Sequence, residues 1–264
     1  MANFERWTKH TPMSDPADHA ASVAELPSDI GALNGVIQGL LIHSDWLTAY
    51  GLDEADYRTV SRDTLPVADL LGAILASDPQ DLRTPRSPDM RAVGTCRDFA
   101  LMLCAFLRSK GVPSRVRCGF AEYFGPVWED HWVCEYWDRE ARMWRLSDAQ
   151  LDDVVAAKCR IAFDPTDVPR RAFMTAGEAW RACRAEERDP HHFGHGNVTG
   201  AWFIKINLIR DHYVLNGLET SAWDSWRAAP LSERVITEQE GVRLDDLAAH
   251  PEQRLVEINP DWLR

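Results

Sequence analysis

The positions of hydrophobic and polar residues along the chain predict three helices in its first half. Apolar residues recur every three or four positions in 28–41, 65–77 and 96–110, which is the spacing of helices with one buried face. Ser28 stands where the first of these helices should be capped. The third should end before Gly111, because glycine suits the left-handed position that follows a helix.

The segment after the third helix has the two-residue period of β-strands. "SRVRCGF" (114–120) alternates polar and apolar side chains. "HWVCEYW" (131–137) and "RMWRL" (142–146) are two further β-rich runs, and the polar turn "DREAR" joins them into a predicted hairpin. A helix followed by a strand and a hairpin predicts an α+β fold with an antiparallel sheet.

The two ends of the chain differ in composition from its middle. Residues 1–27 are polar and contain several prolines, so we interpret them as an irregular N-terminal arm. Residues 28–160 form the predicted core. Residues 161–264 are interpreted as a helical C-terminal extension or subdomain, because amphipathic segments replace the strand pattern there.

The predicted extension carries clear helix signals. Thr175 and Glu178 have the spacing of a capping box, which marks the start of a helix. "GAWFIKINLIRDHYVLNG" (200–217) is apolar on nearly all sides and should be a well-buried helix. Four tryptophans are expected to pack in its core, namely Trp180, Trp202, Trp223 and Trp226.

Composition and charge exclude several classes of protein. The chain is 45% hydrophobic and 27% charged, which is ordinary for a globular protein. Its net charge of -12 argues against general nucleic-acid binding, since phosphate contacts need a basic face. No apolar run approaches the roughly 18 residues of a membrane helix, and the first residues lack a signal-peptide pattern. We therefore expect a cytoplasmic protein with free thiols that binds neither nucleic acid nor membrane.

Cys96 stands in the first turn of the third predicted helix, within "GTCRDFALMLCAFLRSKG". Unpaired backbone N–H groups and the positive end of the helix dipole meet there, and both favour a thiolate. A nucleophilic thiol needs a base, and the base needs a group that orients it. His131 and Asp148 are the candidates, because the start of one antiparallel strand lies beside the end of its partner.

Each of these residues also has a purely structural interpretation. Cys96 could be a small core residue, His131 a hydrogen-bonded residue at a strand end, and Asp148 a turn residue. Asp98 is interpreted as an acidic residue that stabilises the first helical turn. The histidines of "DPHHFGHGN" (189–197) are interpreted as part of a solvated loop rather than a metal site, since a rigid frame and a fourth ligand are lacking.

Three blocks in order, within residues 91–151, resemble the core of the transglutaminase-like superfamily. They are "GTCRDFALMLCAFLRSKGVPSRVRCGF", "DHWVCEYW" and "RLSDAQ". The matching features are a Gly-x-Cys helix start, a Leu-Arg-x-x-Gly-Val-Pro-x-Arg helix end, a strand opened by His-Trp, and an aspartate after the next strand. The resemblance implies a papain-like core, in which the cysteine helix packs on an antiparallel sheet, and a bacterial source.

The resemblance also implies an activity and a set of site residues. A triad of Cys96, His131 and Asp148 would transfer acyl groups, or hydrolyse amides, through a thioester, without a metal or another cofactor. The backbone N–H of Cys96 would be one oxyanion donor. The candidates for the second donor lie upstream and are Gln38, His43 and Trp46. The candidates for substrate binding adjoin the triad and are Arg97 and Trp132.

The acyl donor is expected to be a peptide, amide, ester or thioester, and the acceptor water or an amine. Two alternatives stay open, namely an acyltransferase or amide synthase that uses a carrier-bound thioester, and a non-catalytic binding module that retains the triad. We expect the Trp-rich helices after Thr175 to cover the cleft and select the acyl donor.

Overall fold

The computed structural model describes residues 4–57, 66–219 and 235–253. The chain divides into two compact units, each made of two segments. The first unit comprises Met1–Val116 and Val133–Val168, and the second comprises Arg117–Trp132 and Pro169–Arg264. Helices and antiparallel strands occur together, which confirms the predicted α+β class. None of the helices in the described part of the chain is long and apolar enough to span a membrane.

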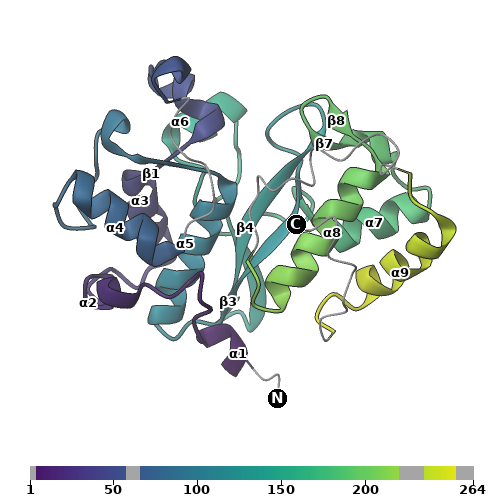
Figure 1. Cartoon of the computed structure of the whole chain (residues 1–264), viewed down its shortest axis with the longest axis horizontal. Coiled ribbons are helices and arrows are strands. Elements are labelled where there is room, and N and C mark those ends of the chain that lie inside the picture. The colour runs from purple at the N-terminus through teal and green to yellow at the C-terminus, as the bar shows by residue number, and fades with distance from the viewer. Residues whose placement is uncertain (1–3, 58–65, 220–234, 254–264) are drawn as a thin grey trace. The chain divides into compact units, whose positions relative to one another are not determined.

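The three helices predicted from the hydrophobic pattern are confirmed in the first unit. They are α3 (Ile30–Leu40), α4 (Val67–Ser77) and α5 (Cys96–Ser109). Both α3 and α4 pack against α5 (Figure 1). The residues of α5 are buried along almost its whole length. The cap of α3 is Asp29 rather than the predicted Ser28, because the Asp29 side chain accepts a hydrogen bond from the backbone of Ala32.

The N-terminal segment contains short helices where an irregular arm was expected. These are α1 (Glu5–Thr8), η1 (Ala17–His19) and α2 (Ala20–Ala24). Trp7 in α1 and Val23 in α2 are buried, and both helices contact α5. One apolar anchor in each short helix therefore holds the segment in place, although neither helix is long enough to show a helical period.

The β4–β5 hairpin of the first unit confirms the predicted pair of strands. β4 covers Trp128–Asp138, and its second half pairs antiparallel with β5 (Met143–Ser147), from Cys134 opposite Ser147 to Asp138 opposite Met143. A second pairing was not predicted. β1 (Leu41–His43) and β2 (Ala92–Gly94) form a parallel pair directly before α5. Strands of three residues are too short to show a period in the sequence.

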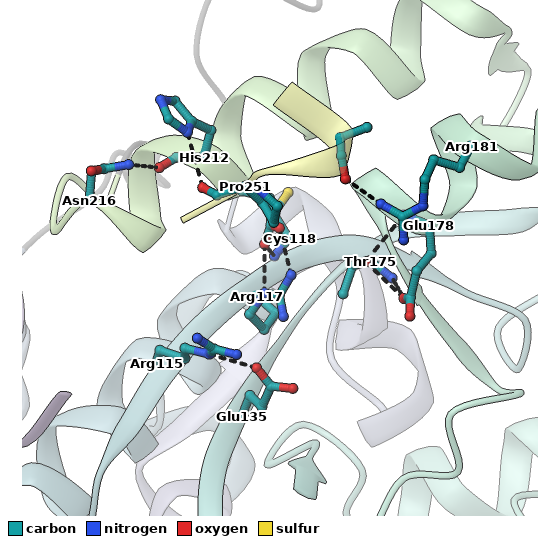
Figure 2. Close-up of polar contacts among 12 residues, drawn as sticks. Arg115, Arg117, Cys118, Glu135, Thr175, Glu178, Arg181, His212, Asn216 and Pro251 are labelled. Carbon is teal, nitrogen blue, oxygen red and sulfur yellow. Dashed lines mark hydrogen bonds and ion pairs between the residues drawn. The ribbon is translucent and has the colours of Figure 1, made fainter. Parts of the chain in front are cut away.

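β3 (Ser114–Ala121) is confirmed as a strand, but all of its side chains are buried, including both arginines. Arg115 donates from Nε to Glu135 at 2.7 Å (Figure 2). The guanidinium also lies 4.3 Å from the ring centre of Trp144. Arg117 is paired with Asp211. These arginines are buried because each has an acidic partner, so the polar–apolar alternation of β3 does not mark a solvent-exposed face.

The larger sheet has the strand order β6-β3-β4-β7-β8, and β5 also pairs with β4. In the second unit, β6 (Phe173–Thr175) pairs with β3, and β7 (Phe193–His195) pairs in parallel with β4 and antiparallel with β8 (Val198–Thr199). The segment predicted as a helical extension therefore also contributes strands. Gly119 permits this pairing, because a Cβ at this position would collide with the carbonyl oxygen of Met174.

The predicted helices of the C-terminal segment are confirmed as α7 (Ala176–Arg184) and α8 (Ala201–Leu215), and α9 (Glu238–Ala249) packs against both (Figure 1). Thr175 and Glu178 form the predicted capping box of α7 (Figure 2). Among the residues that the structure describes, the other helical segments are η2 (Ser44–Tyr50), η3 (Glu54–Tyr57), η4 (Pro88–Met90), α6 (Asp153–Cys159) and η5 (Pro190–His192).

The core of the second unit is formed by apolar residues of α7, α8 and α9 together with strand residues such as Phe120 and Phe193. Trp180 and Trp202 belong to it, as predicted. Trp223 and Trp226 lie outside the described residues. The second unit is thus a mixed α/β body rather than a purely helical one.

Candidate active site

Cys96 is the first residue of α5, so its side chain lies at the helix N-terminus that the sequence predicted. It is buried, with 9% of its surface exposed. Thr95 and Asp98 form a capping box around it, in which Asp98 Oδ2 accepts from the backbone N–H of Thr95 at 2.8 Å. The hydrogen bonds of the capping box hold the backbone on both sides of the thiol.

Asp98 also binds its neighbour Arg97. Arg97 Nη1 donates to Asp98 Oδ1 at 3.1 Å, and the Arg97 side chain is almost completely buried. Gly94 leaves room for this carboxylate, since a Cβ on Gly94 would lie 3.2 Å from Asp98 Cβ. Asp98 therefore does more than favour the helix dipole, because it links the cap residue to the arginine that follows the cysteine.

The parallel pair β1–β2 places one of the oxyanion candidates near this helix start. His43 is the register partner of Gly94, which precedes Cys96 by two residues. His43 Nδ1 accepts from the backbone N–H of Asp45 at 3.1 Å, so the proton of the neutral ring is on Nε2. The ring can therefore donate a hydrogen bond through Nε2. Gln38 in α3 and Trp46 in η2 are both half-buried.

Asp148 directly follows β5 and is 1% exposed. Its Oδ1 accepts from the backbone N–H of Gln150 at 3.0 Å, and its own N–H donates to the carbonyl oxygen of Pro165 at 2.8 Å. Asn34 of α3 donates to the hydroxyl of the preceding Ser147 at 3.1 Å. Asp148 thus sits in a turn that hydrogen bonds hold from both sides.

His131 lies on β4 in the second unit and is 2% exposed. It precedes Cys134 by three residues on this strand, and Cys134 is the register partner of Ser147. Two aromatic rings of the preceding loop, Tyr123 and Phe124, contact its imidazole. These ring contacts were not predicted, because nothing in the sequence pattern shows that the loop folds back onto the strand.

Trp132 follows His131 on β4 and is 1% exposed. Its indole Nε1 is buried, and no hydrogen-bond acceptor reaches it from the described residues 4–57, 66–219 and 235–253. A buried indole N–H usually finds a partner. This donor is therefore available for an acceptor that the described residues do not supply.

A buried polar network joins α8 to β3 and β4 within the second unit. Asp211 of α8 accepts from Arg117 Nε at 3.0 Å, from Arg117 Nη2 at 2.8 Å and from the backbone N–H of Cys118 at 2.9 Å. Asn207 Nδ2 donates to Asp130 Oδ1 at 2.8 Å and to the carbonyl oxygen of Gly119 at 3.2 Å. The network therefore holds both strands against the same helix.

Arg210 completes this network. Its Nη1 donates to Asn207 Oδ1 at 3.0 Å and lies 3.6 Å from Asp130 Oδ2. Asn207, Arg210 and Asp211 have the i, i+3, i+4 spacing of one helix face, and each is fully buried. Asp130 immediately precedes His131, so α8 fixes the strand that carries the candidate base. The polar positions in "INLIRDH" were the available sequence signal for this role.

Residues 189–197 contain η5 and the strand β7 where a solvated loop was expected, and their histidines do not form a metal-binding cluster. Within the described part of the chain, no group of three or more His, Cys, Asp and Glu side chains is arranged to hold a metal ion. His195 instead contacts Glu129 through Nδ1. His191 and His192 are exposed.

Part of the chain is similar to known proteins. No curated protein matches the chain. A solved structure of a proposed cysteine protease from Cytophaga hutchinsonii is similar over 60% of this chain and 45% of its own, with 14% sequence identity and a TM-score of 0.41. The present chain thus spans less than half of that protein. Residues 78–149, from just after α4 to just after Asp148, match the model of the transglutaminase-like superfamily. This match supports a relation of residues 78–149 to the transglutaminase-like superfamily, a superfamily of cysteine enzymes.

Proposed function

We propose that the protein is a cysteine acyltransferase or hydrolase that forms a thioester on Cys96. The position of Cys96 as the first residue of α5, inside a capping box, carries this proposal. The partial positive charge of the helix N-terminus stabilises a thiolate at this position. A structural cysteine stays a neutral thiol and does not need this positive charge, whereas a nucleophilic cysteine needs it in order to form the thiolate.

The proposed mechanism uses the three residues found from the sequence. The Cys96 thiolate attacks the carbonyl carbon of an amide, ester or thioester, and the bond to the leaving group breaks as His131 protonates it. Asp148 orients the His131 ring and stabilises its charged form. Water or an amine then attacks the thioester, gives its proton to His131 and releases Cys96.

The oxyanion of each tetrahedral intermediate needs two hydrogen-bond donors. The backbone N–H of Cys96 is the proposed first donor, because it belongs to the nucleophile itself and lies in the first turn of α5. We propose His43 Nε2–H as the second, ahead of Gln38 and Trp46. The reason is that the hydrogen bond from Asp45 fixes this tautomer, and that His43 is paired with the strand that leads into the cysteine helix.

Limiting iodoacetamide at pH 6 is expected to label Cys96 before the other five cysteines, because only thiolates are alkylated efficiently. Burial and the nearby Asp189 carboxylate raise the pKa of Cys183 to about 11. At pH 6, Cys183 is then a thiolate in only about one protein molecule in 10⁵. Burial and the Asp148 carboxylate raise the pKa of Cys159 as well. Burial, together with the neighbouring Cys104 thiol, raises the pKa of Cys134 strongly. Peptide mapping after partial reaction gives the order of labelling.

The pH dependence provides the control for this experiment. Raising the pH should increase labelling of Cys159 and Cys183 much more than labelling of Cys96, since their thiols remain protonated to higher pH. His131→Ala should slow the labelling of Cys96 and leave that of Cys159 unchanged. If Cys159 or Cys183 reacts faster than Cys96 in the folded protein at pH 6, then Cys96 is a structural residue and the proposed function is wrong.

A further inference from the structure

The loop between β3 and β4 places two aromatic rings against the candidate base. The ring centres of Phe124 and His131 are 4.8 Å apart with an interplanar angle of 68°, and those of Tyr123 and His131 are 5.9 Å apart with an angle of 83°. The two aromatic rings also touch each other, at 4.6 Å. The imidazole is therefore bordered by a pair of mutually packed aromatic side chains that belong to one short loop.

The exposure of these side chains differs from that of the ring they contact. His131 is buried, whereas Tyr123 and Phe124 are only half-buried and so keep apolar surface in solvent. Their loop, residues 122–127, continues with exposed Gly125 and Pro126 and with Val127 before β4 begins. Half-exposed aromatic rings on a loop beside a catalytic group are typical of residues that contact a ligand.

The chemistry of the proposed reaction decides which part of a substrate these rings would meet. His131 must come within about 3 Å of the leaving-group atom in order to protonate it. The rings of Phe124 and Tyr123 border the same imidazole, so substituents on the leaving group fall next to them. The acyl portion is bonded to Cys96 at this stage and is held by the helix start instead.

We propose that Phe124 and Tyr123 determine specificity for substrates whose leaving group is aromatic or another flat apolar group. This inference rests on the proposed function. In the step concerned, the Cys96 sulfur forms a bond to the carbonyl carbon, the bond from that carbon to the leaving-group oxygen breaks, and the proton of the His131 imidazolium passes to this oxygen. An aryl leaving group stacks on Phe124 and Tyr123 while it departs.

Two acetate esters with different leaving groups test this proposal. Phenyl acetate releases an aromatic alcohol, and 2,2,2-trifluoroethyl acetate releases a small non-aromatic one. Because each variant is compared with the wild type on the same ester, differences in intrinsic reactivity cancel. Phe124→Ala should lower kcat/KM about tenfold for phenyl acetate, as expected for the loss of one aromatic contact, and less than about twofold for the trifluoroethyl ester. Tyr123→Ala should also lower kcat/KM more for phenyl acetate than for the trifluoroethyl ester.

Control variants separate a specificity role from a structural one. Phe124→Tyr keeps the ring and should retain the wild-type preference for the phenyl ester. Glu122→Ala alters an exposed residue of the same loop and should leave both esters unchanged. The rate of alkylation of Cys96 by iodoacetamide should be unchanged in Phe124→Ala, because that variant leaves the nucleophile intact.

The outcomes distinguish this inference from the proposed function. The specificity proposal is overturned if the wild type hydrolyses both esters and Phe124→Ala lowers kcat/KM for both by the same factor. It is also overturned if Phe124→Ala leaves both values of kcat/KM unchanged. In either case the rings only support His131. If the wild type turns over neither ester and Cys96 is not preferentially alkylated, the proposed function fails, and the specificity proposal fails with it.

Discussion

Replacing Cys96 by alanine is expected to reduce the hydrolysis of phenyl acetate to the uncatalysed background, a loss of about 10⁴-fold or more. Without the thiolate no thioester can form, and neither His131 nor Asp148 can replace it as a nucleophile. His131→Ala should cause a loss of similar size, because the thiol then lacks its base and the leaving group its acid. Steady-state rates of ester hydrolysis, measured with folded protein at equal concentration, give both values.

Asp148→Asn is expected to retain about a hundred times more activity than Cys96→Ala, because Asp148 only orients and stabilises the histidine. The three active-site variants have controls of the same residue types at half-buried or exposed positions elsewhere. The controls are Cys159→Ala for Cys96→Ala, His192→Ala for His131→Ala, and Asp153→Asn for Asp148→Asn. All three controls should keep wild-type rates within about twofold, as is usual for substitutions away from the site. Full activity of Cys96→Ala on phenyl acetate would show that another residue is the nucleophile.

Asp211→Ala is expected to lower the free energy of unfolding of the second unit by about 3–5 kcal/mol, the usual cost of removing one partner of a buried ion pair. The substitution leaves the Arg117 guanidinium without its carboxylate at a position where only 9% of that side chain is exposed. It also removes the acceptor of the Cys118 backbone N–H. Urea unfolding followed by tryptophan fluorescence measures the change.

An exposed ion pair in the same unit gives the matched control. Asp246 of α9 pairs with His250, which directly follows this helix, and 62% of the Asp246 side chain is exposed. Asp246→Ala should therefore change the free energy of unfolding by less than about 1 kcal/mol. The double variant Arg117→Met, Asp211→Asn should recover part of the loss, because it removes the stranded charge and keeps an acceptor for Cys118. Equal unfolding midpoints for Asp211→Ala and Asp246→Ala would mean that the network does not stabilise the unit.

The local features of the fold and of the site were predictable from the sequence. These features depend on residues that are close together in the chain. Examples are the helix that begins at Cys96, its end before Gly111 and the β4–β5 hairpin. Helical and strand periods, turn residues and caps record such short-range interactions directly. The residues at the ends of these elements, including Cys96 and Asp148, could therefore be singled out before their surroundings were known.

The parts that were missed depend on residues far apart in the sequence. The pairing of β1 with β2, and of β7 with β4, involves two or three residues on each strand, and such short segments have no recognisable period. The network of Asn207, Arg210 and Asp211 was hidden because α8 looks apolar on nearly all sides. Polar residues in such a helix show that buried partners must exist, but not which strands supply them.

Whether Cys96 carries the acyl group is measured most directly by intact-mass spectrometry of the protein after brief incubation with phenyl acetate and an acid quench. The predicted result is a mass increase of one acetyl group, mapped to Cys96, absent from Cys96→Ala and removed by hydroxylamine or by added amine. Prior alkylation of Cys96 should block the adduct, whereas Cys159→Ala should still form it. An acetyl group found only on other residues, or hydrolysis of the ester at full rate by Cys96→Ala, would contradict the assignment of Cys96 as the nucleophile.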